Sequence, residues 1–128
     1  DGAEFSPDGE WLWFNTERFT TDPGHAQLAR IRRDGSELTQ VVTSGSVDWF
    51  PHPAPDSSRL LYLAFEPGTV GHPENRDVVL RILDLESGSP TGAAPRDVFR
   101  LYGGQGTSNV PGWSPDGSRF AFVEYPVS

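Results

Sequence analysis

The sequence predicts an all-β protein made of tandem repeats, each folded as an antiparallel sheet. Three observations lead to this prediction. A short turn motif recurs along the chain, an apolar and aromatic segment follows each copy, and no stretch keeps a 3.6-residue apolar period for three helical turns. The 12 Pro and 14 Gly also interrupt the chain too often for long helices.

The recurring motif predicts a tight turn followed by a strand. Pro presets φ, Asp bonds nearby backbone groups, and Gly accepts positive φ, so Pro-Asp-Gly favours a hairpin turn. The middle copy is degenerate because Ser57 stands where the other copies have Gly. The three motifs, each with its following strand, are residues 5–9 with 11–14, residues 53–57 with 60–63, and residues 113–117 with 120–123.

The strand after the first turn is apolar at consecutive positions. Trp11 and Trp13 point to one face while Leu12 and Phe14 point to the other, so both faces must be buried. Stacked blades of a propeller cover a sheet in this way. We expect the large rings to be buried between blades, and replacement of Phe122 by Ala to cost about 3–5 kcal/mol. The rings expected to be buried are Trp11, Trp13, Phe14, Phe120 and Phe122.

The remaining segments complete four-stranded antiparallel units. Asp34 and Gly35 predict a two-residue hairpin turn between two strands of the first unit. The third unit supplies only its first hairpin, so we expect about two and a half blades. Further strands are expected at residues 27–31, 38–42, 78–83 and 98–102, and the blades at residues 1–45, 46–104 and, as a half blade, 105–128.

The Trp-Ser-Pro-Asp-Gly motif and its aromatic strand resemble the WD-like repeat of TolB-type β-propellers over nearly the whole chain. Residues 49–53, and residues 103–107 followed by 109–111, further resemble bacterial proteins called TolB-like or biopolymer transporter components. The resemblance implies the carboxy-terminal part of a propeller whose last blade is normally completed by strands from the protein's own beginning. It also favours an exported, periplasmic protein, although composition leaves the compartment open.

Composition excludes several classes of partner and site. The net charge of −8 repels nucleic-acid backbones and anionic membranes, and no apolar run approaches the ~20 residues of a membrane span. Without Cys there is no disulfide, thiolate zinc site or cysteine nucleophile. The chain starts at Asp1 and has no Met, so we expect it to be excised from a longer protein and to pair with another copy of itself or with the missing amino-terminal part.

Polar residues stand at equivalent places on the inner strand of each unit. Equivalent positions on successive blades converge on one axis, so we expect them to line a ligand site at the channel mouth. Asp1 also stands at the inner strand of the first unit. Such residues also commonly bond neighbouring backbone or channel water. The expected ligand-binding residues are Glu4, Asp48, Trp49, His52, Gln105 and Asn109.

A divalent metal held by His52 and Gln105 is the alternative use of this site. Propeller lyases that act on uronate sugars resemble this fold and hold a metal with several His and a Gln. The set is incomplete here, because His25 and His72 lie in Gly- and Pro-rich loops without His-x-His spacing. No other cofactor is expected. The insertion at residues 66–76 is long for a hairpin and is either a binding loop or a surface excursion.

Two functional hypotheses follow. The first is a non-enzymatic binding or scaffold module that engages a protein or small ligand at the channel mouth or blade edge. The chain lacks a Gly-x-Ser-x-Gly nucleophile motif, so it carries no acyl-transfer site of its own. The alternative is the propeller of an enzyme, either a metal-assisted oligosaccharide lyase or the accessory domain of a prolyl-oligopeptidase-like peptidase.

Overall fold

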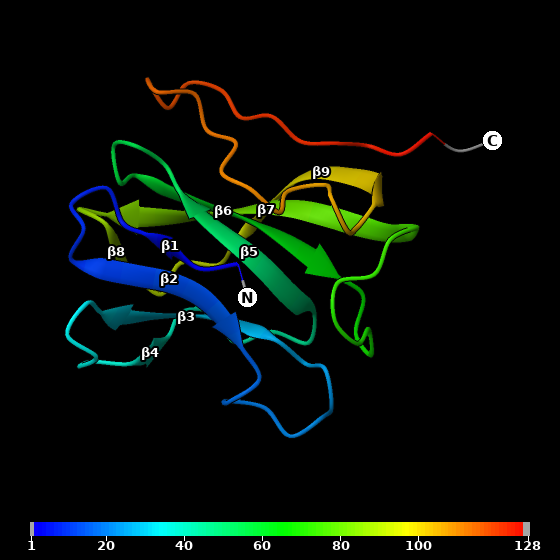
Figure 1. The fold of residues 1–128 in the computed structure, drawn as a ribbon, viewed down its shortest axis with the longest axis horizontal. Helices are drawn as coiled ribbons and strands as arrows, with labels where there is room; N and C mark the ends of the chain where they lie inside the picture. Colours follow the sequence, from blue (N-terminus) through cyan, green and yellow to red (C-terminus); the bar gives the residue numbers. More distant parts are fainter. Residues whose placement is uncertain (1, 127–128) are drawn as a thin grey trace.

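A computed structural model describes residues 2–126, with no helix in this range (Figure 1). The chain forms two antiparallel sheets, followed by the hairpin of the third unit at residues 113–123, which we call the third hairpin. Within the described part, therefore, no helix is long and apolar enough to cross a membrane. The first sheet has the order β1-β2-β3-β4. Its strands are β1 (Glu4–Phe5), β2 (Trp11–Thr16), β3 (Gln27–Arg32) and β4 (Thr39–Gln40).

The second sheet is the four-stranded meander β5-β6-β7-β9, with the short β8 paired to the end of β7. Its long strands match the segments expected from the sequence. In the register of the two central strands, Tyr62 on β6 lies opposite Arg81 on β7. The strands are β5 (Val47–Pro53), β6 (Arg59–Phe65), β7 (Arg76–Glu86), β8 (Ser89–Pro90) and β9 (Arg96–Gly103).

All three Pro-Asp turns share one hydrogen bond, from the backbone N–H two residues after the Asp to its Oδ1. Oδ1 of Asp116 accepts from Ser114 Oγ at 2.7 Å and from Ser118 N at 3.0 Å. These bonds favour the ionised carboxylate, and they lower the pKa of Asp116 to about 2. The degenerate middle turn keeps the same geometry because Ser57 adopts φ 62°, close to the 72° of Gly117.

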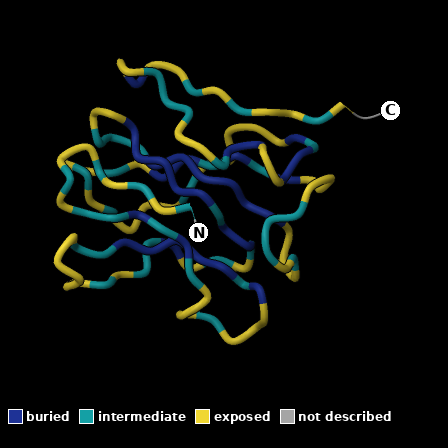
Figure 2. The backbone as a smooth tube through the Cα atoms, viewed as in Figure 1, coloured by how far each residue is buried: buried dark blue, intermediate teal, exposed yellow. Residues whose placement is uncertain are grey.

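Both faces of β5 and β6 in the second sheet are buried (Figure 2), as the consecutive apolar residues predict for β6. One face joins Leu60 and Tyr62 to Trp13 and Leu28 of the first sheet. The opposite face, which includes Leu63, packs against rings of the third hairpin. Side chains of β6 after Arg59 are all buried, which explains why this strand has no polar position.

The third hairpin is less regular than expected, because it does not form two paired strands. Its ladder is reduced to one bridge between Trp113 and Phe120. Beyond it the backbone N–H groups of Ala121, Val123 and Tyr125 donate to carbonyls of three separated residues, so no strand is assigned there. These carbonyls belong to Gly112, Thr107 and Tyr102, respectively.

Burial of the five large rings differs from the expectation. Trp13 is 1% exposed, but the other four rings are only half-buried. Phe120 and Phe122 pack on the second sheet from one side, and their remaining surface faces solvent. Phe122 contacts the ring of Phe99 at 5.0 Å between centroids. A half-buried ring loses less on truncation, so we expect Phe122→Ala to cost less than the value expected from the sequence.

Candidate functional site

One buried imidazole joins three consecutive repeat units. Nδ1 of His52 on β5 lies 2.8 Å from Oε1 of Glu4 on β1, and Nε2 lies 2.6 Å from the carbonyl oxygen of Ser108 in the third unit. The His52 side chain is 3% exposed and that of Glu4 is 21% exposed. The carbonyl of His52 also accepts from Nε1 of Trp113 at 2.8 Å. The inner segments of three units therefore meet at this residue.

The chemistry of these contacts fixes where protons must be. A carbonyl oxygen only accepts, so Nε2 of His52 carries a proton. Nδ1 faces a carboxylate, and this contact also needs a proton between nitrogen and oxygen. Both ring nitrogens are engaged within the fold.

A second group, which we call the aromatic–amide cluster, consists of Trp49, His72, Gln105 and Asn109. The rings of Trp49 and His72 meet edge to face with centroids 4.6 Å apart. Nδ1 of His72 contacts Oε1 of Gln105, which also accepts from Nδ2 of Asn109 at 3.1 Å. Nε1 of Trp49 is shielded from solvent and has no hydrogen-bond partner among residues 2–126.

The loop at residues 104–109 links the two groups. N of Gln105 donates to the carbonyl of Pro73 at 3.1 Å, which brings this loop against the insertion that carries His72. Gly104 permits the approach, because a Cβ at this position would lie 2.1 Å from Pro73 O and its φ is +116°. The same loop continues to Ser108, the acceptor for His52.

Asp48 is separate from both groups, contrary to the expectation of one shared surface. Its carboxylate accepts from Ser44 Oγ and Ser46 Oγ at 2.7 Å each, and from Gln27 Nε2 at 3.3 Å. Burial raises the pKa of this carboxyl, opposed by the Ser46 and Ser44 hydrogen bonds.

The separation has a backbone cause. The β5–β6 register shifts between Trp49 and His52, and Phe50 takes φ 57° at this irregularity. A bulge re-aims the side chains that follow it. Asp48 thus bonds to the loop before β5, while His52 reaches β1 and the third unit. Asp1 lies outside the described residues.

His52 and Gln105, considered together for a divalent metal, have different partners. The imidazole is bonded to Glu4 and Ser108, whereas the carboxamide oxygen of Gln105 is engaged with His72 and Asn109. Over the described range, no group of three or more His, Asp or Glu side chains is arranged to hold a metal ion. The geometry supplies hydrogen-bonding groups and aromatic surface in place of a ligand set.

The structure identifies His72 as a member that the sequence reasoning missed. Its Gly-His-Pro context predicts a surface loop, and the residue does lie in one. The one sequence feature that pointed to His72 was the length of the insertion at residues 66–76, which is typical of either a binding loop or a surface excursion. What a sequence pattern does not contain is the contact between this loop and residues 104–109.

Comparison with known proteins supports the fold. No protein-family model matches the chain. An uncharacterised protein of Agrobacterium fabrum is 39% identical over 125 residues, which cover 98% of this chain and 40% of that protein. A solved structure from Agrobacterium tumefaciens, described as a candidate TolB, is 39% identical with a TM-score of 0.86, over 99% of this chain and 43% of that one.

These similarities extend over nearly the whole chain, which spans about two fifths of the length of each protein that it matches. The expected all-β architecture of antiparallel four-stranded units is confirmed, and it matches the fold of the candidate TolB structure.

Proposed function

We propose that this TolB-like partial propeller is a non-enzymatic binding module that engages a protein or small ligand through the aromatic–amide cluster. The observation that carries the proposal is the shielded N–H of Trp49, which has no partner among residues 2–126 although it lies in a group of polar side chains. A buried donor left unpaired costs about 1–3 kcal/mol, so a ligand that displaces the shielding side chains and accepts from it gains that energy.

The rest of the cluster suits recognition better than catalysis. Gln105 and Asn109 are neutral amides, and both donate and accept hydrogen bonds. Trp49 and His72 add flat aromatic surface, which contributes to binding energy at little cost in conformational entropy. None of the four side chains is an activated nucleophile, and Nδ1 of His72 is engaged by Gln105.

Charge restricts the choice of ligand. The net charge of −8 disfavours anions, so a neutral or basic partner is the better match. Resemblance to TolB-type propellers further favours an exported protein. Cell fractionation of the full-length parent protein tests the location, and a purely cytosolic pool contradicts it.

Indole N–H resonances in a ¹H–¹⁵N spectrum test the proposal directly. The chain has four Trp, and single Trp→Phe variants assign their four signals. The probes are maltotriose as a neutral oligosaccharide and the tripeptide Gly-Arg-Gly as a basic peptide. Saturable movement of the Trp49 signal by one of them is expected, with at least fivefold weaker binding by Asn109→Ala.

A matched control separates the cluster from the rest of the surface. Phe19→Ala removes an exposed ring in the loop after β2, outside the cluster, and should bind like the unmodified chain. If neither probe moves the Trp49 signal, or if Asn109→Ala binds as well as Phe19→Ala, the cluster is not the binding site.

A further inference from the structure

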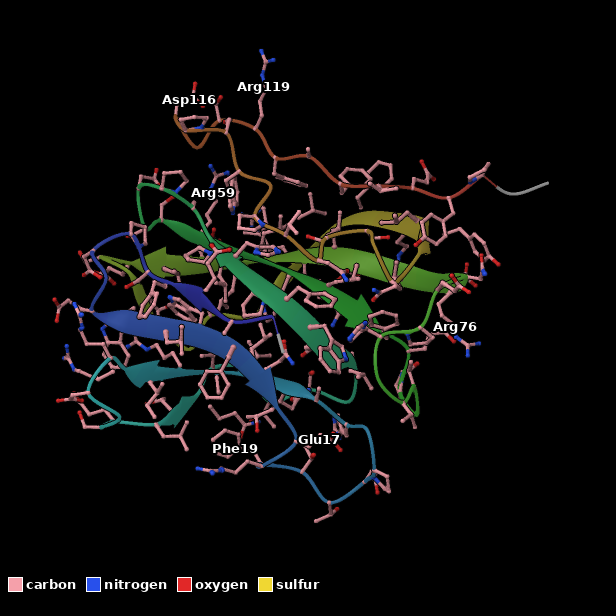
Figure 3. All side chains as sticks on the ribbon, in the orientation of Figure 1. Glu17, Phe19, Arg59, Arg76, Asp116 and Arg119 are labelled. Carbon is pink, nitrogen blue, oxygen red and sulfur yellow. The ribbon has the colours of Figure 1, made fainter. Side chains whose placement is uncertain are left out.

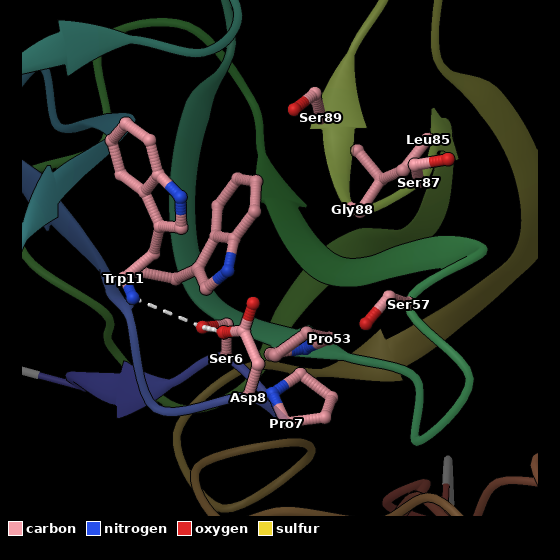
Figure 4. Close-up of a pocket in the computed structure, with 11 residues that line it drawn as sticks. Ser6, Pro7, Asp8, Trp11, Pro53, Ser57, Leu85, Ser87, Gly88 and Ser89 are labelled. Carbon is pink, nitrogen blue, oxygen red and sulfur yellow. Dashed lines mark hydrogen bonds between the residues drawn. The ribbon is translucent and has the colours of Figure 1, made fainter.

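A small pocket lies between the first and second sheets, away from the aromatic–amide cluster (Figure 4). Its volume is about 50 Å³. A water needs roughly 10–15 Å³ on this measure, so the pocket has room for roughly three or four water-sized groups. Its lining residues are Ser6, Pro7, Asp8, Trp11, Trp13, Pro53, Ser57, Leu85, Ser87, Gly88 and Ser89.

One wall of this pocket carries an unsatisfied hydrogen-bond donor. Trp13 is 1% exposed, and its Nε1 has no partner among the described residues. Buried polar groups in native proteins almost always have a partner in protein or water, so this N–H calls for an acceptor. Trp13 is one of the residues that line the pocket, so this space is where an acceptor could approach its indole.

The wall is held in place from behind. The guanidinium of Arg30 lies over the ring of Trp11 at 3.8 Å and 5.4 Å from the ring of Trp13. Nη1 of Arg30 donates to the carbonyl of Gly88 at 3.2 Å, which ties the first sheet to the turn between β7 and β8. A fixed indole pair keeps its space open, because the rings cannot collapse into it.

Asp8, which also lines the pocket, offers a hydrogen-bond acceptor. Oδ1 of Asp8 accepts from Ser6 Oγ at 2.6 Å and from Glu10 N at 3.0 Å, whereas Oδ2 receives no hydrogen bond from the described residues. Ser6 Oγ is in turn fixed by the N–H of Trp11 at 3.0 Å (Figure 4). The hydrogen bond from Ser6 lowers the pKa of the Asp8 carboxyl, so it stays ionised at neutral pH and repels anions.

We propose that this pocket is a binding site for a primary carboxamide, whose oxygen accepts from Trp13 Nε1 and whose NH₂ donates to Asp8. A carboxamide has three heavy atoms, is neutral, and carries acceptor and donor side by side. The match to the pocket is therefore in size, charge and hydrogen-bonding pattern. Asn and Gln side chains of a partner segment and small free amides share this group. The site does not depend on the aromatic–amide cluster.

The test uses the Trp13 indole signal in the same ¹H–¹⁵N spectrum. Acetamide is the probe for a free amide, and an uncharged Gly-Gln-Gly peptide with blocked ends is the probe for a side chain. Both probes should shift the Trp13 signal saturably. The one that binds more tightly indicates whether a free amide or a side chain is the better ligand. N,N-dimethylacetamide lacks the donor and acetate is an anion, so each should bind at least tenfold more weakly than acetamide.

Asp8→Asn tests the second contact without removing the turn, because its Oδ1 still accepts from Ser6 and Glu10. Binding of acetamide should weaken at least threefold. The matched control is Asp116→Asn, which changes the same motif position in the third unit and lies outside the pocket. It should leave binding unchanged.

Three results overturn the proposal. The first is a Trp13 indole signal whose chemical shift does not change with either amide probe. The second is equal binding of acetamide, dimethylacetamide and acetate. The third is equal loss of binding in Asp8→Asn and Asp116→Asn. Movement of the Trp49 signal alone leaves the aromatic–amide proposal standing and contradicts this one.

Discussion

Nδ1 of His52 lies 2.8 Å from Oε1 of Glu4, a contact that closes a loop of 48 residues between the first and second sheets. Removing the carboxylate by Glu4→Ala leaves the buried Nδ1 of His52 without its hydrogen-bond partner. We expect the free energy of unfolding to fall by about 1–3 kcal/mol. Urea unfolding measures it, with Glu74→Ala as an exposed control of the same type. Equal midpoints for the two variants would contradict the role given to the contact.

Gly104 should be the least replaceable glycine near the cluster. In Gly104→Ala the new Cβ meets Pro73 O in addition to an unfavourable positive φ, so we expect a cost of about 2–4 kcal/mol. Gly68→Ala is the matched control, because its φ is +89° but nothing lies within 4 Å of its Cβ position. It should cost about 1–2 kcal/mol. Thermal unfolding of both variants gives the steric part by difference.

Leu63 of the second sheet and Phe122 of the third hairpin pack in the same apolar layer, but they should differ in their contribution to stability. Leu63 is 0% exposed, and Leu63→Ala should lower the free energy of unfolding by about 2–5 kcal/mol. Phe122 is half-buried, so Phe122→Ala should lower it by about 1–2 kcal/mol. Denaturant titration ranks them. A larger effect at Phe122 would mean that the third hairpin is packed more tightly than described.

The Pro-Asp turn of the third unit should titrate at unusually low pH. The hydrogen bond from Ser114 is the main cause of an Asp116 pKa of about 2, against 3.8 for a free Asp. Because the folded pKa is depressed, the stabilising contribution is present above pH 3.8 and is lost as the pH falls toward 2. Carboxyl ¹³C shifts followed against pH should give this midpoint, and Ser114→Ala should raise it. A midpoint near 3.8 in the unmodified chain would refute the turn geometry.

The isolated chain should associate with another copy or with a complementary segment of its parent. Exposed apolar side chains on β9 and the third hairpin favour this, because such patches mark interaction surfaces. Light scattering should show a mass that rises with concentration in the micromolar range, and Phe99→Asp should reduce it. A monomer across that range without any partner segment would contradict the expectation. The exposed side chains are Val98, Phe99, Val110 and Val123.

Short-range chemistry determined most of the fold. Pro-Asp-Gly and Pro-Asp-Ser form turns through bonds within two residues of Asp8, Asp56 and Asp116, so a local pattern is enough to predict them. Apolar runs of consecutive residues likewise predicted β2 and β6, since a strand buried on both faces needs no polar position. The strand expected at 120–123 is not assigned, because backbone pairing depends on a neighbouring strand as well as on its own residues.

The candidate site depended on tertiary structure. Glu4, Asp48 and His52 look equivalent in the repeat, yet the bulge at Phe50 sends Asp48 to a serine network and His52 to Glu4. A one-residue irregularity is invisible in a period-two pattern, but it changes the direction of every side chain beyond it. His72 joins the cluster only because Gly104 lets two loops touch. The sequence by itself thus determined the turns and the main strands, whereas the burial of the large rings and the meeting of the polar side chains were decided by the packing of distant segments.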